Sequence, residues 1–418
     1  MFRKMESIKK VGFFLGICIF SSCAWLQSEK PMHLQSGLYR ATIYRPDGIG
    51  IPFQLAVADS GGKTIAFIIN GAERIEIDSV VEHHQHFQLH MPLFNSDFVG
   101  LALNDGTLQG QWIRHLPDSD QHFFFRAIPD TARFDVHRPA RFNISGTWAT
   151  YYLRSGRKDT AFAVGLLHQE GHQLWGTFMH SDGDDRYLAG VVDGDTLKLS
   201  TFNGGDLYLY TASIADDHTL RDGRFYSGYA GYARWWARKD STAHLPNALS
   251  LTTVIPGKEL LDFRFPDLNG DTVALHDFRG KVVLVEIMGS WCPNCMDETA
   301  FLSQLYDQYH DRGLQILALA YERSADISAS RQAVMSFQRR FHVAYPMLLT
   351  GVAYNDPRMI EKTLPNIQHF QAFPTTLFID KSGRIRYIHT GFAGPGTGTY
   401  YTQTIHEFQS LIDTLLHE

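Results

Sequence analysis

The sequence predicts an all-β region over about residues 35–240, followed by an α/β domain with a central mixed sheet flanked by helices over residues 257–418. In the first region polar and apolar residues alternate, as in residues 53–57 and 87–91, and turn signals recur at short intervals. In the second region, apolar strand-like runs alternate with stretches of helical periodicity, which is typical of layered α/β domains. A chain of 418 residues is long enough for two or three packed domains.

The N-terminus has the features of a secretory signal. Basic side chains come first and an apolar stretch over residues 11–20 follows, which is too short to span a bilayer. The stretch ends in Phe20-Ser21-Ser22-Cys23, which resembles the lipobox of bacterial lipoproteins. We therefore expect a signal peptide over residues 1–22, lipidation of Cys23 and a tether over residues 23–34. Ordinary secretion and an uncleaved anchor are the alternatives.

The charge balance argues against nucleic-acid binding. Cleavage after residue 22 would remove four basic and one acidic side chain, leaving 34 Lys and Arg against 43 Asp and Glu, a net charge of −9. A nucleic-acid partner would require a basic face, so the acidity is better explained by solubility. With Cys23 lipidated, Cys292 and Cys295 would be the remaining thiols, and stability would depend on packed cores rather than on structural disulfides.

The all-β region repeats itself once. Ser36-Gly37-Leu38-Tyr39 is echoed 109 residues later by Ser145-Gly146-Thr147-Trp148, and residues 107–112 are echoed by residues 219–225 at an offset of 112. These similar offsets indicate a duplication, with repeat 1 over residues 35–128 and repeat 2 over residues 140–240. Each repeat has room for several short strands, which favours two small barrels or sandwiches, and one merged β-structure is the alternative. A linker is expected over residues 241–256, which contain two prolines.

The α/β domain is expected to begin with a hairpin, formed by residues 261–265 and 272–275. The further elements are a strand at 282–288, a helix from 293 to about 311, a strand at 314–320, a helix near 326–342, a strand at 345–349, a short helix after 357, strands at 375–380 and 384–388, and a last helix. That last helix places Tyr401, Ile405, Phe408, Ile412 and Leu415 on one face.

Two cysteines, Cys292 and Cys295, open the helix that follows the apolar strand at 282–288. A helix N-terminus offers unpaired N–H groups and a positive dipole end, which favours a thiolate at Cys292. Pro293 suits the first helical turn, and Cys295 lies one turn further on, within reach of a mixed disulfide formed at Cys292. The pair predicts a redox-active disulfide, with Cys292 as nucleophile and Cys295 as resolving thiol. The alternative, half of a zinc site, needs two more ligands, of which His310 could supply one.

Residues 257–418 resemble the thioredoxin fold of the TlpA/ResA-like family, bacterial thiol:disulfide oxidoreductases that are membrane-tethered or secreted. Four features carry the resemblance: the strand followed by Ser290-Trp291-Cys292-Pro293-Asn294-Cys295, the early hairpin closed by residues 275–281, an extra helical segment before the penultimate strand, and Ala372-Phe373-Pro374-Thr375-Thr376-Leu377-Phe378-Ile379-Asp380. The resemblance does not extend to the β-rich region.

The resemblance implies roles for two residues near the dithiol. Pro374 would be the cis-proline that faces the active-site sulfurs and pairs with the substrate backbone. Glu286 occupies the position of the buried acid of thioredoxin and would take the proton from Cys295, since a carboxyl in an apolar strand has a raised pKa. The alternative for Glu286 is a strand-end carboxylate that pairs with Lys281 or Arg386.

The resemblance also implies a substrate-binding surface. Trp291 and Phe373 would be flat apolar walls beside the sulfurs, and Gly391 and Phe392 fall in the third substrate loop of thioredoxin. Ordinary core packing is the alternative for each aromatic. Glu298 matches a glutamate that is frequent in the family, whereas Ala300 replaces a proline, so the first helix is expected to lack its usual kink.

These features predict a cell-envelope thiol:disulfide oxidoreductase that reduces disulfides of exported proteins. It would face the periplasm as a lipoprotein or be soluble there, need no cofactor, and receive electrons from a membrane thiol reductase, because the sequence shows no recycling domain. One alternative is a peroxiredoxin-like thiol peroxidase, whose Thr-x-x-Cys site the sequence lacks. Another is a β-region that binds a ligand or partner and carries an accessory redox domain.

Three weaker signals favour ordinary structure. His84, His86 and His90 would share one strand face, where a metal site is conceivable but an exposed face explains them equally well, so no metal is expected. Residues 181–185 are acidic but lack the register of a calcium loop, and a solvated turn is expected. Residues 394–398 lack the lysine of a phosphate loop and are expected to form a flexible turn.

Overall fold

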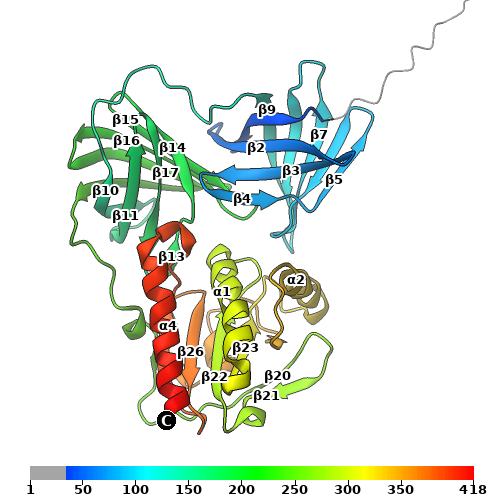
Figure 1. Ribbon diagram of the computed structural model, residues 1–418, viewed down its shortest axis with the longest axis vertical. Helices are drawn as coiled ribbons and strands as arrows, with labels where there is room; N and C mark the ends of the chain where they lie inside the picture. The colour runs from blue at the N-terminus through cyan, green and yellow to red at the C-terminus, as the bar shows by residue number, and fades with distance from the viewer. Residues whose placement is uncertain (1–33) are drawn as a thin grey trace, which may run out of the picture.

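The computed structural model describes residues 34–418. The predicted signal peptide, the lipidation site at Cys23 and nearly all of the tether lie outside these residues. Two β units lie side by side at the top of Figure 1, and an α/β domain lies beneath both of them. In the described part of the chain, no helix combines the length and apolarity needed to cross a membrane.

The first β unit is an open antiparallel sheet with the strand order β4-β3-β2-β1-β9-β8-β7-β6-β5. Its strands are β1 (Gly37–Tyr44), β2 (Gly50–Ser60), β3 (Lys63–Asn70), β4 (Glu73–Glu76), β5 (Ser79–His83), β6 (His86–His90), β7 (Ser96–Ala102), β8 (Leu108–Arg114) and β9 (Gln121–Pro129). Alternate side chains point to one face and form an aromatic core that includes Phe53, Phe98, Trp112 and Phe125. Strands β4 and β5 remain as its edges.

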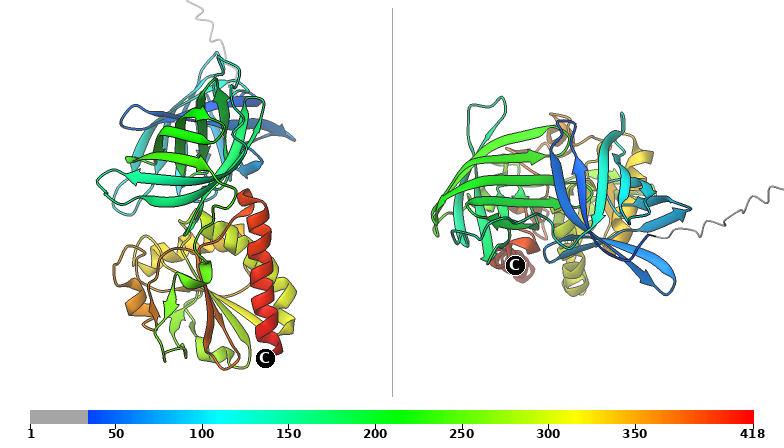
Figure 2. Two further views of the ribbon diagram at one scale, coloured as in Figure 1. Left: turned by 90° about the vertical axis from the view of Figure 1, so that its left-hand side faces the viewer. Right: turned by 90° about the horizontal axis from the view of Figure 1, so that it is seen from above.

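The second β unit is a closed barrel. Its strands are β10 (Gly146–Arg154), β11 (Ala161–Glu170), β12 (Gln173–His180), β13 (Gly183–Asp184), β14 (Leu188–Asp193), β15 (Thr196–Phe202), β16 (Leu207–Asp216), β17 (Thr219–Ser227) and β18 (Gly231–Lys239). The order β11-β10-β18-β17-β16-β15-β14-β12 closes on itself because β11 also pairs with β12. Figure 2 shows these strands curving around the unit, and closure leaves no free sheet edge.

The two β units share a local arrangement at their first strands. β1 pairs with β9 and β2, and β10 pairs in the same way with β18 and β11. The Tyr39 hydroxyl donates to the carbonyl of Gln35 (2.7 Å), and Trp148 Nε1 donates to the carbonyl of Ile144 (2.9 Å), in both cases four residues back. These matching contacts agree with the repeat in the sequence, although one copy is open and the other closed.

The α/β domain contains the mixed sheet β24-β23-β22-β26-β27. Its elements are β20 (Arg264–Pro266), β21 (Thr272–Ala274), β22 (Val282–Met288), α1 (Pro293–Tyr309), β23 (Leu314–Ala320), α2 (Ile327–Arg340), β24 (Met347–Leu349), α3 (Met359–Thr363), β26 (Thr375–Ile379), β27 (Ile385–Thr390) and α4 (Thr399–His417). β22 runs parallel to β23 and antiparallel to β26. This is a thioredoxin-like fold, so the predicted fold class is confirmed.

Short elements complete the C-terminal half. They are β19 (Thr253–Val254) and β25 (Ile367–Gln368), which pair with each other, and the 3₁₀ turns η1 (Ala248–Ser250), η2 (Leu275–Phe278), η3 (His310–Arg312) and η4 (Pro395–Thr397). β19 lies inside the segment 241–256 that was expected to be a linker, so the end of this segment is held against the α/β domain.

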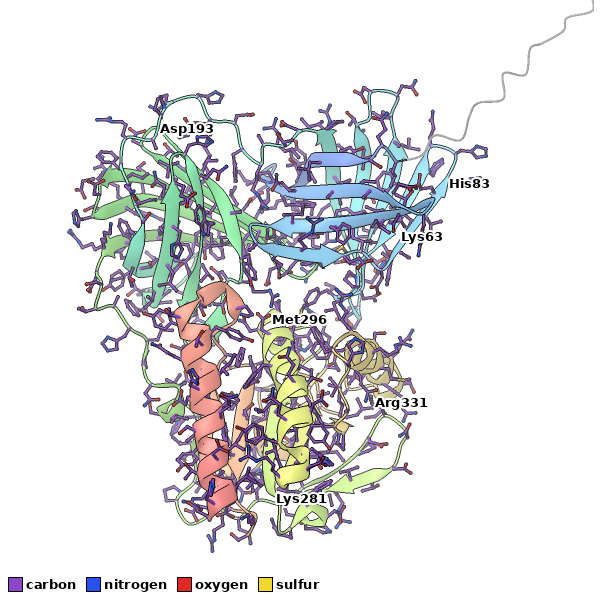
Figure 3. The ribbon with its side chains drawn as sticks, in the orientation of Figure 1. Lys63, His83, Asp193, Lys281, Met296 and Arg331 are labelled. Carbon is purple, nitrogen blue, oxygen red and sulfur yellow. The ribbon has the colours of Figure 1, made fainter. Side chains whose placement is uncertain are left out.

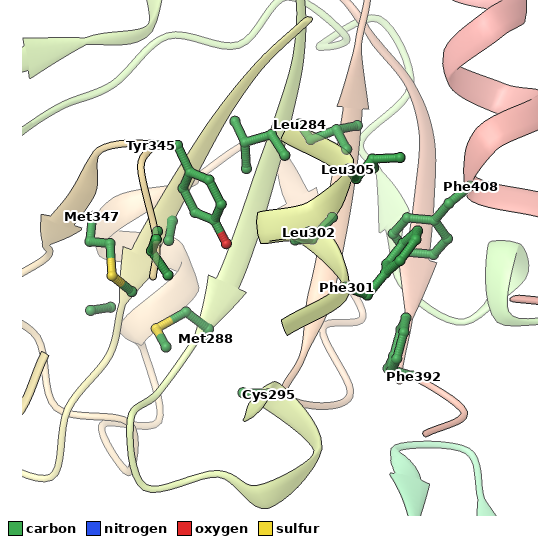
Figure 4. Close-up of a cluster of buried hydrophobic side chains, with 14 of the residues drawn as sticks. Leu284, Met288, Cys295, Phe301, Leu302, Leu305, Tyr345, Met347, Phe392 and Phe408 are labelled. Atoms are coloured by element: carbon green, nitrogen blue, oxygen red, sulfur yellow. The ribbon is translucent and has the colours of Figure 1, made fainter. Parts of the chain in front are cut away.

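The core of the α/β domain lies on both faces of its sheet. Side chains of α1, α2 and α4 pack on one face, and α3 with the segment before β22 packs on the other. Phe408 of α4 is fully buried and its ring contacts those of Phe301, Phe378 and Phe392 (Figure 4). The helical spacing in the sequence thus identifies the buried face of α4.

Replacing Phe408 by alanine should destabilise the α/β domain by about 3–5 kcal/mol, because it opens a cavity that the rigid sheet cannot fill. Hydrogen exchange followed by mass spectrometry should show faster exchange in β22 and α1, with β18 unaffected. The control Met335→Ala, at a residue that is 41% exposed on α2, should change little. Unchanged protection in β22 would contradict the assigned packing of α4.

Three expectations about the weaker signals need correction. His84 lies in the turn between β5 and β6 with a φ of 55°, so the three histidines do not share one strand face. His90 instead contacts Asp97 (3.0 Å). No cluster of three metal-ligating side chains occurs within residues 34–418. The acidic turn is not solvated, because Asp184 and Asp185 are buried, and the turn at 394–398 is fixed by the bond from Gly394 N to Asp184 Oδ2 (2.7 Å).

Candidate dithiol site

Cys292 and Cys295 lie at the N-terminus of α1, directly after the central strand β22. Cys292 is the N-cap residue, with Pro293 in the first turn, and the backbone N–H of Cys295 donates to Cys292 Sγ (3.4 Å). The Cys292 thiol donates to the carbonyl of Phe373 (3.6 Å). Both cysteines are free thiols; Cys292 is 5% exposed and Cys295 is fully buried. This arrangement directs a helix N–H group at the first sulfur.

Pro374 directly precedes β26, the strand that pairs with β22. The Phe373–Pro374 peptide bond is cis, and the carbonyl before it is the one that contacts Cys292. The carbonyl of Pro374 accepts a hydrogen bond from the backbone N–H of Gly391 (2.8 Å), which joins this segment to the loop after β27.

Glu286 lies on β22 and is fully buried beneath the dithiol. It accepts hydrogen bonds from the hydroxyls of Thr299 (2.6 Å) and Tyr345 (3.3 Å), and not from Lys281 or Arg386. Burial raises the pKa of Glu286 to about 7, although both hydroxyls favour its charged form. A carboxyl with this pKa can exchange a proton near neutral pH.

Glu298 is a second buried carboxyl at the site, to which the sequence assigned no role. Its Oε1 accepts a hydrogen bond from the hydroxyl of Thr376 (2.9 Å), whereas its Oε2 has no hydrogen-bond partner. Burial, and then repulsion from Glu286, raise the pKa of Glu298 well above its usual value. Glu298 lies three residues after Cys295 on a helix and therefore on the same helix face. This spacing is the sequence feature that could have placed Glu298 at the site.

Burial also raises the pKa of the Cys295 thiol well above its usual value, with further contributions from Cys292 and Glu286. The second cysteine is therefore held protonated until a base accepts its proton. Glu286 is one of the groups whose charge acts on this thiol, which makes it a candidate for that base.

An aromatic group stands beside Cys292. Trp291 Nε1 donates to the carbonyl of Tyr321 (2.8 Å). The centroid of the indole ring lies 4.2 Å from the ring centroid of Tyr354 and 5.4 Å from the ring centroid of Phe373. Both Trp291 and Phe373 remain partly exposed, so they can present an apolar surface next to the sulfur. Arg323 lies over the indole at 5.5 Å.

Gly391 and Phe392 are placed differently from the other predicted substrate-binding residues. Phe392 is 1% exposed and packs against Phe301 and Phe408 in the core (Figure 4). Gly391 has a φ of 76°, and a Cβ there would lie 2.7 Å from the carbonyl oxygen of Ser181 in the barrel. Neither residue therefore offers an exposed side chain to a substrate.

The barrel holds the start of α1 through Arg186, a residue that the sequence gave no reason to select. Arg186 Nη1 donates to the carbonyl of Pro293 (3.1 Å) and to the Asp297 carboxylate, and Nη2 pairs with Glu73 Oε1 of the open sheet (2.7 Å). The Asn294 side-chain amide pairs with the backbone N–H and carbonyl of Asp184. All three parts of the molecule thus meet at the active-site turn.

Burial, and then repulsion from Asp297, raise the pKa of Asp184 to about 7. Its Oδ2 accepts the N–H of Gly394, so the barrel turn also contacts the loop before α4. In Figure 1, β13 lies beside the upper end of α4, on the side that faces α1.

Residues 91–95, the β6–β7 loop of the open sheet, reach the hydrophobic cluster that contains the dithiol. Leu93 belongs to the same buried cluster as Cys292 and Met296, and Phe94 packs at its edge. Figure 3 places Met296 at the upper end of α1, facing the β units. Both β units therefore lie close to the N-terminal end of α1.

Comparison with known proteins gives consistent results for the C-terminal part. The Redoxin family model matches residues 255–403. Thiol-disulfide oxidoreductase ResA of Geobacillus kaustophilus is 30% identical over 140 residues, 34% of this chain and 72% of that protein. ResA of Bacillus subtilis is 24% identical over 185 residues, 44% of this chain and 84% of that protein. A thiol:disulfide interchange protein of the thioredoxin family from Chlorobium tepidum TLS is 18% identical with a TM-score of 0.30, over 42% of this chain and 99% of that one.

Proposed function

We propose that this chain, which belongs to the ResA-type thiol-disulfide oxidoreductases, reduces disulfides of exported proteins in the cell envelope through Cys292 and Cys295. The observation that carries the proposal is the position of Cys292 as N-cap of α1, with the N–H of Cys295 directed at its sulfur. A thiolate formed there is stabilised by the helix N-terminus and is the species that attacks disulfides.

The reaction would proceed in two exchanges. The Cys292 thiolate attacks one sulfur of the substrate disulfide, which forms a mixed disulfide and releases the other substrate sulfur as a thiolate. Cys295 then loses its proton and attacks Cys292 Sγ, which releases the second substrate sulfur and leaves a Cys292–Cys295 disulfide. The substrate gains two electrons and two protons, and the protein loses them.

Glu286 is the proposed acceptor of the Cys295 proton. A pKa of about 7 lets Glu286 accept a proton near neutral pH, whereas burial and the charge of Glu286 raise the pKa of Glu298 well above its usual value and so favour its neutral form. Pro374 is proposed to align the substrate backbone, and Trp291 and Phe373 to flank its disulfide.

Replacing Glu286 by glutamine should slow the release of the substrate from the mixed disulfide by about 100-fold or more at pH 8, because the general base is lost. In the wild type, the rate of release should rise as pH increases through about 7, where Glu286 loses its proton. Stopped-flow measurement of the tryptophan fluorescence change over pH 5–9 would show this inflection, and the variant should lack it.

The same substitution has a predictable effect on stability. The folded-state pKa of Glu286 lies above its ordinary value of 4.5, so the folded protein keeps a proton that the unfolded chain has lost between about pH 4.5 and 7. Stability contributed by this group therefore falls as pH rises through that window. Glu286→Gln should weaken this fall.

A Glu286→Gln variant that releases the substrate more slowly but keeps the pH inflection of the wild type would contradict the role of Glu286 as base.

The electron donor and the location belong to the same proposal. An oxidised Cys292–Cys295 pair must be reduced again, and we propose that a membrane thiol reductase does this at the outer face of the membrane, with the chain held there by lipid on Cys23. Palmitate labelling of the wild type and its loss in Cys23→Ala would test the anchor.

Trapping identifies the substrate. The full chain with Cys295→Ser, produced in its own cell envelope, should retain exported proteins on Cys292 as mixed disulfides, which mass spectrometry would identify; Cys292→Ser/Cys295→Ser is the control. A reduction potential above that of the trapped disulfides would contradict reduction as the direction of the reaction.

A further inference from the structure

A cavity of about 850 Å³ lies between the open sheet and the α/β domain, next to the dithiol. Residues 90–95 and 115–117 form one wall, and α2 with Ser290 and Trp291 forms the other. Since Trp291 directly precedes Cys292, the cavity reaches the residues beside the nucleophile. Its volume falls within the range of about 300–1,000 Å³ that is usual for ligand sites, enough for several side chains of an extended peptide.

The carboxylates that line this cavity already have partners. Asp326 caps α2 by accepting the N–H groups of Ser328 and Ala329 (2.8 and 2.9 Å). Glu322 accepts both the N–H and the hydroxyl of Ser290 (2.8 and 2.7 Å). The third lining carboxylate, Asp78, pairs with Arg340 (3.9 Å), and the charge of Glu322 also acts on the neighbouring Arg323.

Two lining arginines have no carboxylate oxygen within 4.0 Å among residues 34–418. Arg323 lies over the rings of Trp291 and Tyr354, at 5.5 and 5.9 Å, and Arg339 donates to the hydroxyl of Ser336 (3.2 Å). One of these arginines lies beside the residue that precedes Cys292, and the other lies near the end of α2.

A further arginine, Arg114, acts electrostatically on Arg323 although it does not line the cavity. Arg114 of β8 is half-buried; its Nη1 donates to the side-chain oxygen of Gln121 (3.5 Å), whereas its Nε has no hydrogen-bond partner. Burial, and then the like charge of Arg323 across the interface, lower the pKa of Arg114, while Asp206 opposes the shift. An anion near Arg323 would relieve this repulsion, because it would neutralise the charge that Arg114 faces.

We propose that this cavity binds the substrate as an extended acidic polypeptide segment, with Arg323 and Arg339 contacting its carboxylates and Trp291 packing beside its disulfide. The inference rests on the proposed function, since it concerns the substrate of the same dithiol. It assigns the open sheet the role of selecting substrates, because residues 90–95 and 115–117 supply one wall of the groove.

The test uses the reduced full chain and two peptides that contain the same internal disulfide, one flanked by glutamates and the other by lysines. At low ionic strength the acidic peptide should be reduced about tenfold faster, and 0.5 M salt should remove most of this preference. In the variant Arg323→Gln/Arg339→Gln the ratio of the two rates should fall to about one. The control Arg234→Gln/Arg238→Gln, which removes two exposed charges from β18, should keep the wild-type ratio.

The outcomes separate this inference from the proposed function. Equal rates for the two peptides, or a ratio that Arg323→Gln/Arg339→Gln does not change, would overturn the inference while leaving the function in place. Faster reduction of glutathione disulfide than of either peptide would assign the arginines to a small-molecule disulfide and also overturn it. Failure to reduce either peptide or 2-hydroxyethyl disulfide would contradict the proposed function itself.

Discussion

Serine at position 292 should reduce disulfide exchange to the uncatalysed level, whereas serine at position 295 should permit one attack and then stop. Cys292 lies at the helix N-terminus with the N–H of Cys295 directed at its sulfur, which is why we propose it as the attacking thiol. Cys295 is fully buried and burial raises its pKa, so it reacts only after a mixed disulfide has formed next to it.

Intact mass spectrometry after addition of a disulfide peptide would distinguish the two variants. Cys295→Ser should accumulate one peptide adduct per chain on Cys292, and Cys292→Ser should accumulate none. Each variant serves as the control for the other, because both remove one thiol from the same turn. Adducts on Cys295 in the Cys292→Ser chain would reverse the assigned roles.

Replacing Arg186 by methionine should release the barrel from the active-site turn. The guanidinium is nearly buried and pairs with Glu73 and Asp297, so its loss leaves two buried carboxylates without a cation, at a cost of about 3–5 kcal/mol. Because this energy holds the barrel against α1, opening should become roughly 100- to 4,000-fold more frequent. Iodoacetamide should then modify Cys292 faster, and hydrogen exchange should accelerate in residues 181–186 and 391–398.

Two further variants separate release of the barrel from general misfolding. Arg138→Met removes an exposed pair with Asp195 and should cost under about 1 kcal/mol. Adding Glu73→Gln and Asp297→Asn to Arg186→Met removes the unpaired charges and should restore much of the stability. Exchange that accelerates throughout both β units, or an unchanged rate of Cys292 alkylation, would contradict a local role for Arg186.

Local patterns were sufficient to predict the thioredoxin-like domain. β22 is an unbroken apolar run because both faces of a central strand are buried, and α1 begins where Cys292 and Pro293 supply an N-cap and a first turn. The helical spacing around Phe408 likewise identified the buried face of α4. In each case the chemistry that decides the structure lies within a few residues.

Features that depend on distant contacts were not predictable. Asp184 is buried because its carboxylate meets Gly394, 210 residues away, so an acidic turn that should be solvated is an interdomain contact. Phe392 follows a strand, as a loop residue would, yet α1 and α4 cover it. The closure of the barrel depends on pairing between β11 and β12, and no local pattern distinguishes this barrel from the open sheet.

The placement of Arg186 shows the same limit. A lone arginine after an acidic turn has no distinctive spacing. The structural role of Arg186 depends on its contacts with Glu73, Pro293 and Asp297, which come from two other parts of the chain. The candidate site is therefore predictable in its dithiol, in Glu286 and in Pro374, but not in the β-unit contacts that enclose it.

Reaction of the fully reduced chain with an equimolar disulfide peptide tests most directly whether Cys292 and Cys295 act as one dithiol. We predict that one equivalent of peptide dithiol forms, and that peptide mapping finds a single new disulfide joining Cys292 to Cys295. A peptide that stays oxidised, or reduction without formation of that disulfide, would contradict the assignment of this pair as the redox centre.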